Sequence, residues 1–357
     1  MNTFPEKPLV LRAGPTARKM LQEDGFDPAN VDMVVAASGG PKWQVLSGLD
    51  RVLFPLLRNV QRSSPLDLVA SSIGSWRMAC LAHDDPSGAI ARFEEIYLDQ
   101  HYSAKPSTDE ITAEAERLLD ALLGEQGANE ITNSWARLHV IVARCKGLLK
   151  SESPAVQMAG LGLFAAGNVI SRRTLGWHVE RVILAADIAA SPFRTLSDLP
   201  TRHAPLDAGN AREALLASGA IPLVFKGREI PHAPGGIYRD GGLIDYHPAF
   251  DFGSEEGLVL YPHFYDEIIP GWFDKKLPWR RGGGRNFDRV LMLAPSDEFI
   301  AALPGGHVPD RKDFYTHDDA TRERNWRGVL DASRRLGDDF LELVEQGGWQ
   351  DRLKPFE

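Results

Sequence analysis

The sequence has little cysteine and no long apolar run, and each shortage excludes a class of protein. Its two cysteines, Cys80 and Cys145, lack the spacing of metal ligands and are too few for a disulfide framework, so we expect a reducing compartment. No stretch reaches the ~18 apolar residues that a membrane-spanning helix needs. The segment Met1–Lys7 has no apolar signal-peptide core. We therefore expect a cytoplasmic protein with at most peripheral contact with a membrane.

The charge balance lacks a basic excess. The 357 residues include 40 Lys and Arg against 49 Asp and Glu, which gives a formal net charge of -9. This balance disfavours a general nucleic-acid binder, so no nucleic-acid partner is expected. It also disfavours tight electrostatic docking to anionic membranes, although the cations within 275–289 could act locally.

No linker, repeat or charge block divides the chain. Hydrophobic residues make up 43% of it, an ordinary value for a globular protein. We predict one domain over residues 1–357. Its motif-bearing core is expected over roughly 31–250, followed over 251–357 by strands, an aromatic and basic loop, and a helix.

A short strand that turns into a helix at a serine is the most informative stretch. Residues 66–70 form an apolar run, and the residues after Gly74 suit a buried helix. Ser72 stands at the bend, with the small residues Ala70 and Gly74 two positions to either side, which is the spacing of a nucleophile elbow. These flanking positions crowd each other and must be small. Alone, the pentapeptide also fits an ordinary strand-to-helix turn.

A glycine-rich turn precedes the elbow. Residues 31–37 predict a buried strand, which runs into Ser-Gly-Gly-Pro-Lys-Trp at 38–43 and then into a helical pattern. A strand, a glycine turn and a helix N-terminus together make an anion site. The N–H groups of Gly39 and Gly40 are the natural donors to an oxyanion, with Lys42 as a further candidate. The alternatives are a turn without a ligand and a phosphate loop, but the Gly-Lys-Ser/Thr spacing of a phosphate loop is absent.

A third glycine turn follows an aspartate. Asp240 ends a short predicted strand and precedes Gly241 and Gly242. The glycines let another backbone or a substrate approach the carboxylate closely. Asp-Gly is also a common hairpin signal, so this turn is ambiguous by itself.

In this order, the three turns resemble the motifs of the patatin-like phospholipase family. Residues 38–43 are similar to the family's Gly-Gly-Gly-x-Arg/Lys-Gly oxyanion loop, residues 70–74 to its Gly-x-Ser-x-Gly elbow, and residues 240–242 to its Asp-Gly-Gly/Ala motif. Residues 215–222 resemble the alanine-rich segment ahead of that aspartate. The resemblance implies an α/β fold, a three-layer α/β/α sandwich with a mostly parallel central sheet, and hydrolysis of lipid acyl esters.

The resemblance also implies a catalytic dyad of Ser72 and Asp240. Ser72 would attack the ester carbonyl, Asp240 would take its proton without a histidine relay, and water would release the acyl group. An aspartate at its reference pKa of ~3.9 is a weak base, so oxyanion stabilisation by Gly39 and Gly40 must supply much of the rate. The residues expected to support the loop and the elbow are Lys42, Ala70, Gly74, Gly241 and Gly242. The expected partner is a lipid acyl ester, and this chemistry requires no metal or cofactor.

Three alternatives stay open on the sequence. A Ser-His-Asp hydrolase is one, because Asp187 and either His247 or His263 follow Ser72 in the order that it needs. A non-catalytic lipid-binding scaffold is another, supported by Ser38 in place of the first loop glycine. The third is acyl transfer, in which the same dyad passes the acyl group to an alcohol other than water.

Two further segments have two interpretations each. Residues 155–170 are apolar and rich in small residues, which favours a helix buried against the sheet over a mobile flap or an interfacial helix beside an acyl pocket. Aromatic and basic residues are interleaved over 261–285, which suits a lipid interface but suits a loop folded back on the core somewhat better. Trp43, in place of the last loop glycine, is expected to narrow the groove or line an acyl site.

Overall fold

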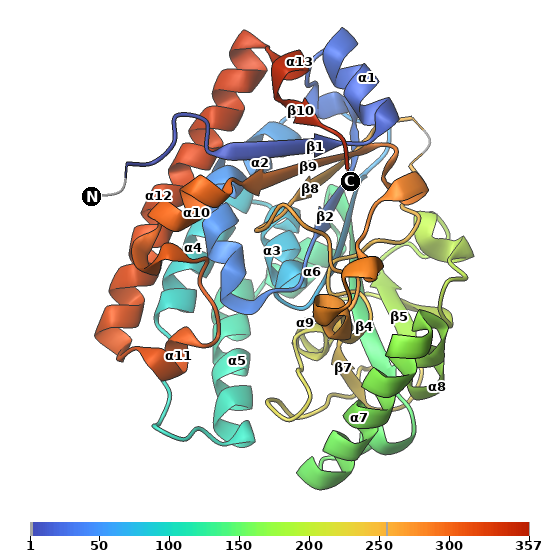
Figure 1. The fold of residues 1–357 in the computed structure, drawn as a ribbon. Helices are drawn as coiled ribbons and strands as arrows, with labels where there is room; N and C mark the ends of the chain where they lie inside the picture. Colours follow the sequence, from blue (N-terminus) through green and yellow to red (C-terminus); the bar gives the residue numbers. More distant parts are fainter. Residues whose placement is uncertain (1–2, 255, 357) are drawn as a thin grey trace.

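One large mixed sheet organises the computed structural model, which describes residues 3–254 and 256–356 (Figure 1). Met1 and Asn2, part of the segment without a signal-peptide core, lie outside the described residues. The strands of the described residues are β1 (Leu9–Ala13), β2 (Val31–Ala36), β3 (Leu66–Ser71), β4 (Ala136–Cys145), β5 (Val179–Ala185), β6 (Thr201–Pro205), β7 (Tyr238–Asp240), β8 (Leu258–Pro262), β9 (Val290–Pro295) and β10 (Leu353–Lys354).

The sheet runs in the order β10-β1-β9-β8-β2-β3-β4-β5-β6, and β7 pairs with β4 beside this path. The β1–β9, β4–β5 and β4–β7 pairs are antiparallel, and the other pairs are parallel. The predicted α/β class with a mostly parallel sheet is therefore confirmed. Strands β3, β5, β8 and β9 are buried along their whole length, which explains why they are mostly apolar and do not alternate between apolar and polar residues.

Helices α2, α3, α4 and α12 pack against one another, and the long helix α12 runs alongside α2 and α4 (Figure 1). The helices of the described residues are α1 (Pro15–Glu23), α2 (Ser47–Arg58), α3 (Ile73–Ala82), α4 (Pro86–Leu98), α5 (Thr108–Leu123), α6 (Gly127–Thr132), α7 (Pro154–Ile170), α8 (Leu175–His178), α9 (Ala211–Ser218), α10 (Asp297–Ala302), α11 (Asp313–Thr316), α12 (Asp319–Gln346) and α13 (Trp349–Arg352). Within residues 3–254 and 256–356, none of them combines the length and the apolar character that crossing a bilayer requires.

Helix α12 shows how local signals set the ends of an element. The Asp318 carboxylate caps its first turn by accepting the Thr321 N–H at 2.7 Å. Gly347 ends it with a φ of 77°, a conformation that glycine adopts without strain. Between these ends Trp326, Leu336 and other apolar residues at helical spacing face the core, as the sequence pattern predicts.

Helix α7 departs from the expectation of a helix buried against the sheet. Its inner face is buried, and there Leu161 and Phe164 join Ala143 and Cys145 of β4 in a small second core. Its outer face is exposed to solvent, and the Ile170 side chain is 84% exposed. The expectation is wrong for this outer face, because only one side of the helix meets the rest of the protein.

The aromatic and basic loop after β8 mostly folds back on the core, as expected. Phe264 is buried, and Phe273 packs on Phe164 with ring centroids 5.5 Å apart. Trp279 is the exception and is 67% exposed. The loop therefore belongs to the core at its start and to the surface near Trp279.

Trp43 does not narrow the groove or line an acyl site, contrary to expectation. It is buried and stacks on Phe93 with ring centroids 4.2 Å apart. Tyr97 meets the same two rings edge-on. Trp43 therefore anchors the 3-10 helix η2 (Gly40–Leu46) to α4, which explains why a large residue is tolerated at this position of the loop.

Candidate active site

Strand β4 brings the predicted nucleophile and base together, because β3 and β7 pair with successive stretches of the same strand. Ser71, the last residue of β3, pairs with Ile141, and Asp240, the last residue of β7, pairs with the next residue, Val142. Ser72 therefore leaves β3 beside Asp240. The Ser72 hydroxyl donates a 2.8 Å hydrogen bond to Asp240 Oδ2.

Ser72 lies in a sharp turn between β3 and α3. Its φ of 55° and ψ of -135° form a backbone conformation that a residue with a side chain adopts only under strain. Gly74 leaves room for the end of β2, since a Cβ there would lie 2.8 Å from the Ala36 carbonyl oxygen and 2.7 Å from that of the next residue, Ala37. The elbow expected from Ala70, Ser72 and Gly74 is thus present as backbone geometry.

Substituting Gly74 with alanine is expected to lower the free energy of unfolding by about 1–3 kcal/mol, because the crowding atoms are backbone atoms that cannot rotate away. Urea denaturation measures this change. Gly162 on the exposed face of α7 is the matched control, since a Cβ there meets no atom within 4 Å. Gly162→Ala is expected to stabilise the protein by about 0.5–1 kcal/mol. Equal destabilisation at both positions would contradict the crowding argument.

A serine that the sequence analysis did not single out fixes the elbow. The Ser72 N–H donates to Ser218 Oγ at 2.8 Å, and the Ser218 hydroxyl donates to the Ile141 carbonyl at 2.7 Å. Ser218 is the last residue of α9, so it ties the elbow to both α9 and β4. Its only signal in the sequence is its place within the alanine-rich segment 215–222.

Burial makes Asp240 a better base than a free aspartate. Desolvation raises the pKa of Asp240 to about 6, and hydrogen bonds from the Gly242 N–H and the Ser72 hydroxyl partly oppose this rise. The Gly242 N–H lies 2.7 Å from Oδ1, which leaves Oδ2 for the serine. Any side chain on Gly242 would meet the Ser38 hydroxyl, with Cβ at 2.6 Å from that oxygen. The double-glycine turn therefore aims the carboxylate at Ser72.

Gly39 and Gly40 face the same small cavity as Ser72 and Asp240. Gly40 has a φ of 57° in the turn that opens η2. Among the residues that the structure describes, neither glycine N–H has a hydrogen-bond acceptor. Unpaired N–H groups beside a nucleophile are what oxyanion stabilisation requires.

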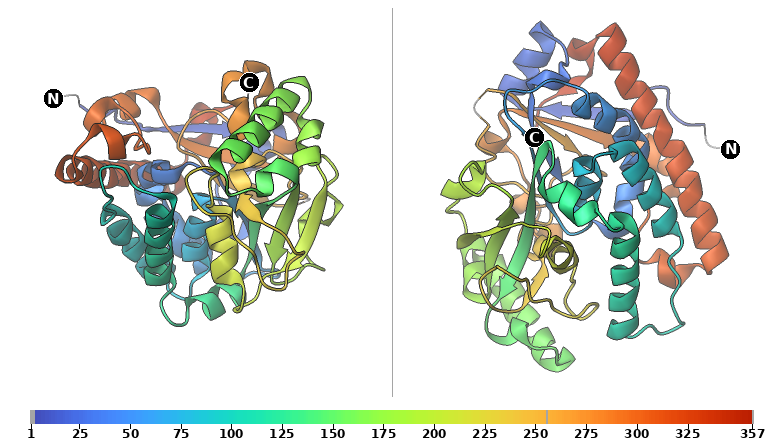
Figure 2. Two further views of the ribbon diagram at one scale, coloured as in Figure 1. Left: turned by 90° about the horizontal axis from the view of Figure 1, so that it is seen from below. Right: turned by 180° about the vertical axis from the view of Figure 1, so that it is seen from behind.

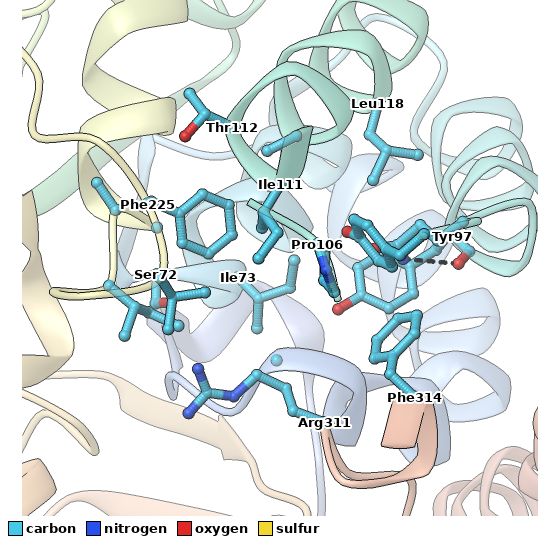
Figure 3. Close-up of a pocket in the computed structure, with 18 of the residues that line it drawn as sticks. Ser72, Ile73, Tyr97, Pro106, Ile111, Thr112, Leu118, Phe225, Arg311 and Phe314 are labelled. Carbon is cyan, nitrogen blue, oxygen red and sulfur yellow. Dashed lines mark hydrogen bonds between the residues drawn. The ribbon is translucent and has the colours of Figure 1, made fainter. Parts of the chain in front are cut away.

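Three cations also line this cavity: Lys42, Lys275 and Arg311. Lys42 forms an ion pair with Asp310. Within the described part of the chain, Lys275 and Arg311 have no carboxylate at ion-pair distance. In Figure 3 the Arg311 side chain points toward the side of the site where Ser72 lies. Arg311 cannot be recognised in the sequence as a site residue, because it belongs to no motif and approaches the site from a distant segment.

Lys275 is held over aromatic rings. Its Nζ lies 4.4 Å from the ring centroid of Tyr246 and 5.8 Å from that of Trp272. Desolvation, and then the neighbouring charges of Lys42 and Arg311, lower the pKa of Lys275 to about 8. The site thus has a net positive field next to the dyad, although the whole chain is acidic.

A larger apolar cavity of about 530 Å³ opens beside Ser72 (Figure 3). Ile73, Ile111, Leu118 and Phe225 are among its lining residues. Its volume lies in the range of small-molecule sites. The cavity is large and apolar enough for an acyl chain.

The geometry does not favour the histidine alternative. His247 and His263 are fully buried with ring centroids 4.3 Å apart, and burial lowers the pKa of both, that of His263 to about 3. His247 Nδ1 accepts the Ile269 N–H at 2.9 Å. Asp187 is exposed, and among the described residues its carboxylate accepts a hydrogen bond only from the nearby Ala190 N–H. The structure does not bring these residues to Ser72 as a triad.

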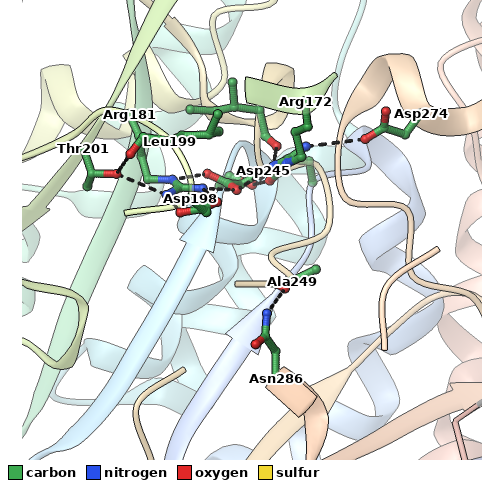
Figure 4. Close-up of polar contacts among 12 residues, drawn as sticks. Arg172, Arg181, Asp198, Leu199, Thr201, Asp245, Ala249, Asp274 and Asn286 are labelled. Carbon is green, nitrogen blue, oxygen red and sulfur yellow. Dashed lines mark hydrogen bonds and ion pairs between the residues drawn. The ribbon is translucent and has the colours of Figure 1, made fainter. Parts of the chain in front are cut away.

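A buried charge network supports the turn that carries Asp240 (Figure 4). Arg181 donates to both oxygens of Asp245 at 2.7 and 2.9 Å, and to Asp198 at the same two distances. The Asp245 N–H donates to the Gly241 carbonyl at 2.9 Å. Its own carbonyl accepts the Ser71 hydroxyl. The network therefore connects β5 to both the elbow and the aspartate turn.

These features define an α/β protein with a nucleophile elbow paired to a buried aspartate. The chain belongs to the patatin-like phospholipase family, whose model matches residues 63–252, more than half of the sequence. This range includes Ser72 and Asp240 but begins after Gly39 and Gly40. Membership implies a lipid acyl hydrolase that acts on lipid esters.

The other comparisons add little. No curated protein has a significant match to the chain. Among solved structures, the chain is similar to the crystal structure of the type III effector protein ExoU, with 15% identity and a TM-score of 0.27. The match covers 95% of this chain and 58% of that one, so the chain spans less than two thirds of its length. We draw no conclusion from a likeness this low.

Proposed function

We propose that the protein is a serine acyl hydrolase of the phospholipase or lysophospholipase type, which acts through Ser72 and Asp240. One observation carries the proposal: the strained Ser72 donates its hydroxyl, at 2.8 Å, to the buried Asp240. This arrangement suits a hydroxyl that must lose its proton as it attacks a carbonyl. The free N–H groups of Gly39 and Gly40 and the adjacent apolar cavity support it.

The reaction follows from these positions. Ser72 Oγ forms a bond to the ester carbonyl carbon while its proton passes to Asp240 Oδ2. The carbonyl oxygen becomes an oxyanion held by the N–H groups of Gly39 and Gly40. The carbon–oxygen bond to the alcohol then breaks, and Asp240 returns the proton to that alcohol. Water attacks the acyl-enzyme with the same assistance and releases the fatty acid.

The test is to incubate phospholipid and lysophospholipid with the protein and to analyse the products by mass spectrometry, with Ser72→Ala as the blank. Free fatty acid formed only by the wild type supports hydrolysis. Adding an alcohol acceptor in the same assay detects acyl transfer as a new ester. If the folded wild type yields neither product, the proposal is wrong.

The two cations without a carboxylate partner favour a substrate with an anionic group beside its ester. Lys275 and Arg311 lie in the cavity of the dyad, outside the range matched by the family model. A phosphodiester or phosphomonoester would give these cations a partner. A neutral glyceride would offer them no such partner.

The double variant Lys275→Gln/Arg311→Gln is therefore expected to raise KM for a phospholipid by about 10- to 100-fold. Rates on a neutral short-chain ester are expected to stay within about threefold. Steady-state kinetics on both substrates measure the difference. Lys312→Gln is the control, because Lys312 is the exposed neighbour of Arg311 and does not line the cavity. Equal losses on both substrates would refute a headgroup role.

The pH dependence follows from the same two groups. Asp240 accepts a proton only when it is ionised, so kcat/KM is expected to fall about tenfold per pH unit below its pKa of about 6. For a phospholipid, kcat/KM is also expected to decline above pH 8, as Lys275 loses its charge. Rates measured from about pH 4 to about pH 9 would test both limbs.

Two variants assign the limbs of this profile. The residual activity of Asp240→Asn is expected to show no inflection near pH 6, and Lys275→Gln is expected to remove the alkaline limb only. An acid limb that persists in Asp240→Asn would assign the base to another group.

A further inference from the structure

Exposed apolar side chains gather at one place on the molecule. Ten large hydrophobic side chains are exposed among the described residues, and nine of them lie on α7 or in segments next to it. Those on α7 are Val156, Met158, Leu163, Val169 and Ile170. Those in the neighbouring segments are Leu148, Trp177, Leu223 and Trp279. A concentration of this kind on a folded protein marks an interaction surface.

Contacts place the four neighbours beside α7. The short helices η3 (Gly147–Lys150) and α8, which contain Leu148 and Trp177, pack against α7. The Leu223 N–H donates to the Gln157 side chain of α7. Trp279 precedes Arg280, whose guanidinium donates to the Asn168 carbonyl of α7 at 2.6 Å. We call these nine side chains the α7 face.

The outer side of α7 is apolar without interruption. The helix has 17 residues and no charged side chain. At 100° per residue, its exposed positions after Pro154 cover an arc of about 160°. That arc contains only alanine, glycine and the five large apolar residues. The polar residues Gln157 and Asn168 point inward, where both are buried and hydrogen-bonded.

The α7 face borders the entrance to the candidate active site. Gln157 holds Leu223, and Ile221, two residues earlier, lines both cavities next to Ser72. At the other end of the helix, Asn168 donates to Asp274 at 2.6 Å, and the next residue is Lys275 of the cavity. In Figure 1 α7 lies at the lower right, at the far end of the molecule from α1 and α13.

The charges around the α7 face are mainly positive, and the exposed Glu152 just before α7 is paired with Arg239 at 2.7 Å. The segments packed most closely on α7 are η3, η4 (Arg172–Thr174), α8 and η7 (Trp272–Lys276). Their cations are Lys150, Arg172, Arg173, Lys275 and Lys276. Their one acid, Asp274, is buried and bonded to Asn168 and Arg172. The local charge is thus opposite in sign to the net charge of -9 of the whole chain.

We propose that the α7 face docks the protein onto an anionic phospholipid surface, with the active-site entrance against the lipid. Leu163, Ile170 and their neighbours would enter the boundary between headgroups and acyl chains. Trp177 and Trp279, which are 75% and 67% exposed, suit the headgroup level. The exposed cations Lys150, Arg173 and Lys276 would face anionic headgroups. This inference rests on the proposed function, because it supplies the route by which a lipid ester reaches Ser72.

The test measures binding separately from catalysis. All proteins carry Ser72→Ala, so that no product alters the vesicles, and flotation is measured on phosphatidylcholine vesicles with and without phosphatidylserine. The parent is expected to bind, more tightly with phosphatidylserine. Leu163→Asp/Ile170→Asp is expected to lower its partitioning by at least about tenfold. Both positions are solvent-exposed, so the thermal unfolding midpoint is expected to be unchanged.

Gln22→Asp/Gln346→Asp is the matched control. It adds the same two negative charges on α1 and at the end of α12, at the opposite end of the molecule from α7 (Figures 1 and 2). This control is expected to bind vesicles as the parent does. A similar loss in both double variants would mean that only net charge matters, which would overturn the proposal.

Other outcomes also decide the matter. Absence of vesicle binding by the parent overturns the proposal, as does unchanged binding by Leu163→Asp/Ile170→Asp. A parent that is dimeric without lipid, with a monomeric double variant, would assign the α7 face to a second copy of the chain. With Ser72 restored, hydrolysis of a soluble short-chain ester tests the proposed function by itself, so failure of docking and failure of catalysis are distinguishable.

Discussion

Replacing Ser72 with alanine is expected to lower kcat/KM for ester hydrolysis by about 10⁴-fold or more, because the nucleophile is lost. Asp240→Asn is expected to cost about 10³-fold, since the amide still accepts the Gly242 N–H but cannot take the serine proton. Initial rates on a soluble ester measure both losses. The double variant Ser72→Ala/Asp240→Asn is expected to have about the same kcat/KM as Ser72→Ala alone, because the two residues act as a unit.

Ser75→Ala is the matched control for these variants. Ser75 is a buried serine of α3, the helix that follows Ser72. Its hydroxyl contacts that of Ser218 at 3.1 Å and does not reach Asp240. Its rate is expected to stay within about tenfold of the wild type. If Asp240→Asn kept most of the activity while folded variants of His247 or His263 lost it, the dyad would be wrong and a histidine base would replace it.

Replacing Arg181 with methionine is expected to lower the free energy of unfolding by about 3–5 kcal/mol. Arg181 is completely buried and is the main partner of the equally buried Asp245. Without it, the one cation that stays within ion-pair distance of Asp245 in the described part of the chain is Arg172, whose nearest nitrogen lies 3.2 Å away. Urea denaturation near neutral pH measures the loss.

Arg202→Met is the control for Arg181. Arg202 is an exposed arginine of β6 that pairs with Glu180 at 3.0 Å. Because the Arg202 side chain is exposed and Glu180 also has Arg144 at 2.8 Å, this variant is expected to change stability little, by about 0–1 kcal/mol. An Arg181→Met protein as stable as Arg202→Met would show that the network does not support the aspartate turn.

The local parts of the candidate site could be predicted from the sequence, because they depend on short-range backbone geometry. A strained turn needs small residues at fixed spacing, and Ala70 and Gly74 satisfy this requirement around Ser72. Gly242 is crowded by Ser38 from a distant segment, but it can be recognised because it directly follows Asp240 and Gly241 in a double-glycine turn. Short motifs of this kind leave a readable pattern.

The parts that depend on long-range pairing could not be derived from local patterns, and the sequence indicated the pairing of Ser72 with Asp240 only through the family resemblance. Asp240 meets Ser72 because β7 continues along β4 where β3 ends, and no local pattern encodes that register. Arg311 and Ser218 reach the site from distant segments for the same reason. The raised pKa of Asp240 also depends on burial, which the sequence alone does not specify.

Apolar composition by itself does not determine whether a residue is buried in the core or exposed to solvent. Residues 155–170 and Trp43 are both strongly apolar, yet Trp43 is in the core and half of α7 faces solvent. A helix that is apolar on all sides is compatible with complete burial in the protein core, and it is equally compatible with contact with lipid on one side. Only the packing of α7 against β4 decides which face remains exposed.

Labelling with a fluorophosphonate probe tests the central claim most directly. Intact mass and peptide mapping would be applied to the wild type, Ser72→Ala and Asp240→Asn. We predict a single adduct on Ser72 in the wild type, no adduct in Ser72→Ala and much slower labelling of Asp240→Asn. A folded wild-type protein that gains no adduct, or gains it at another residue, would contradict the assignment of Ser72 as the nucleophile.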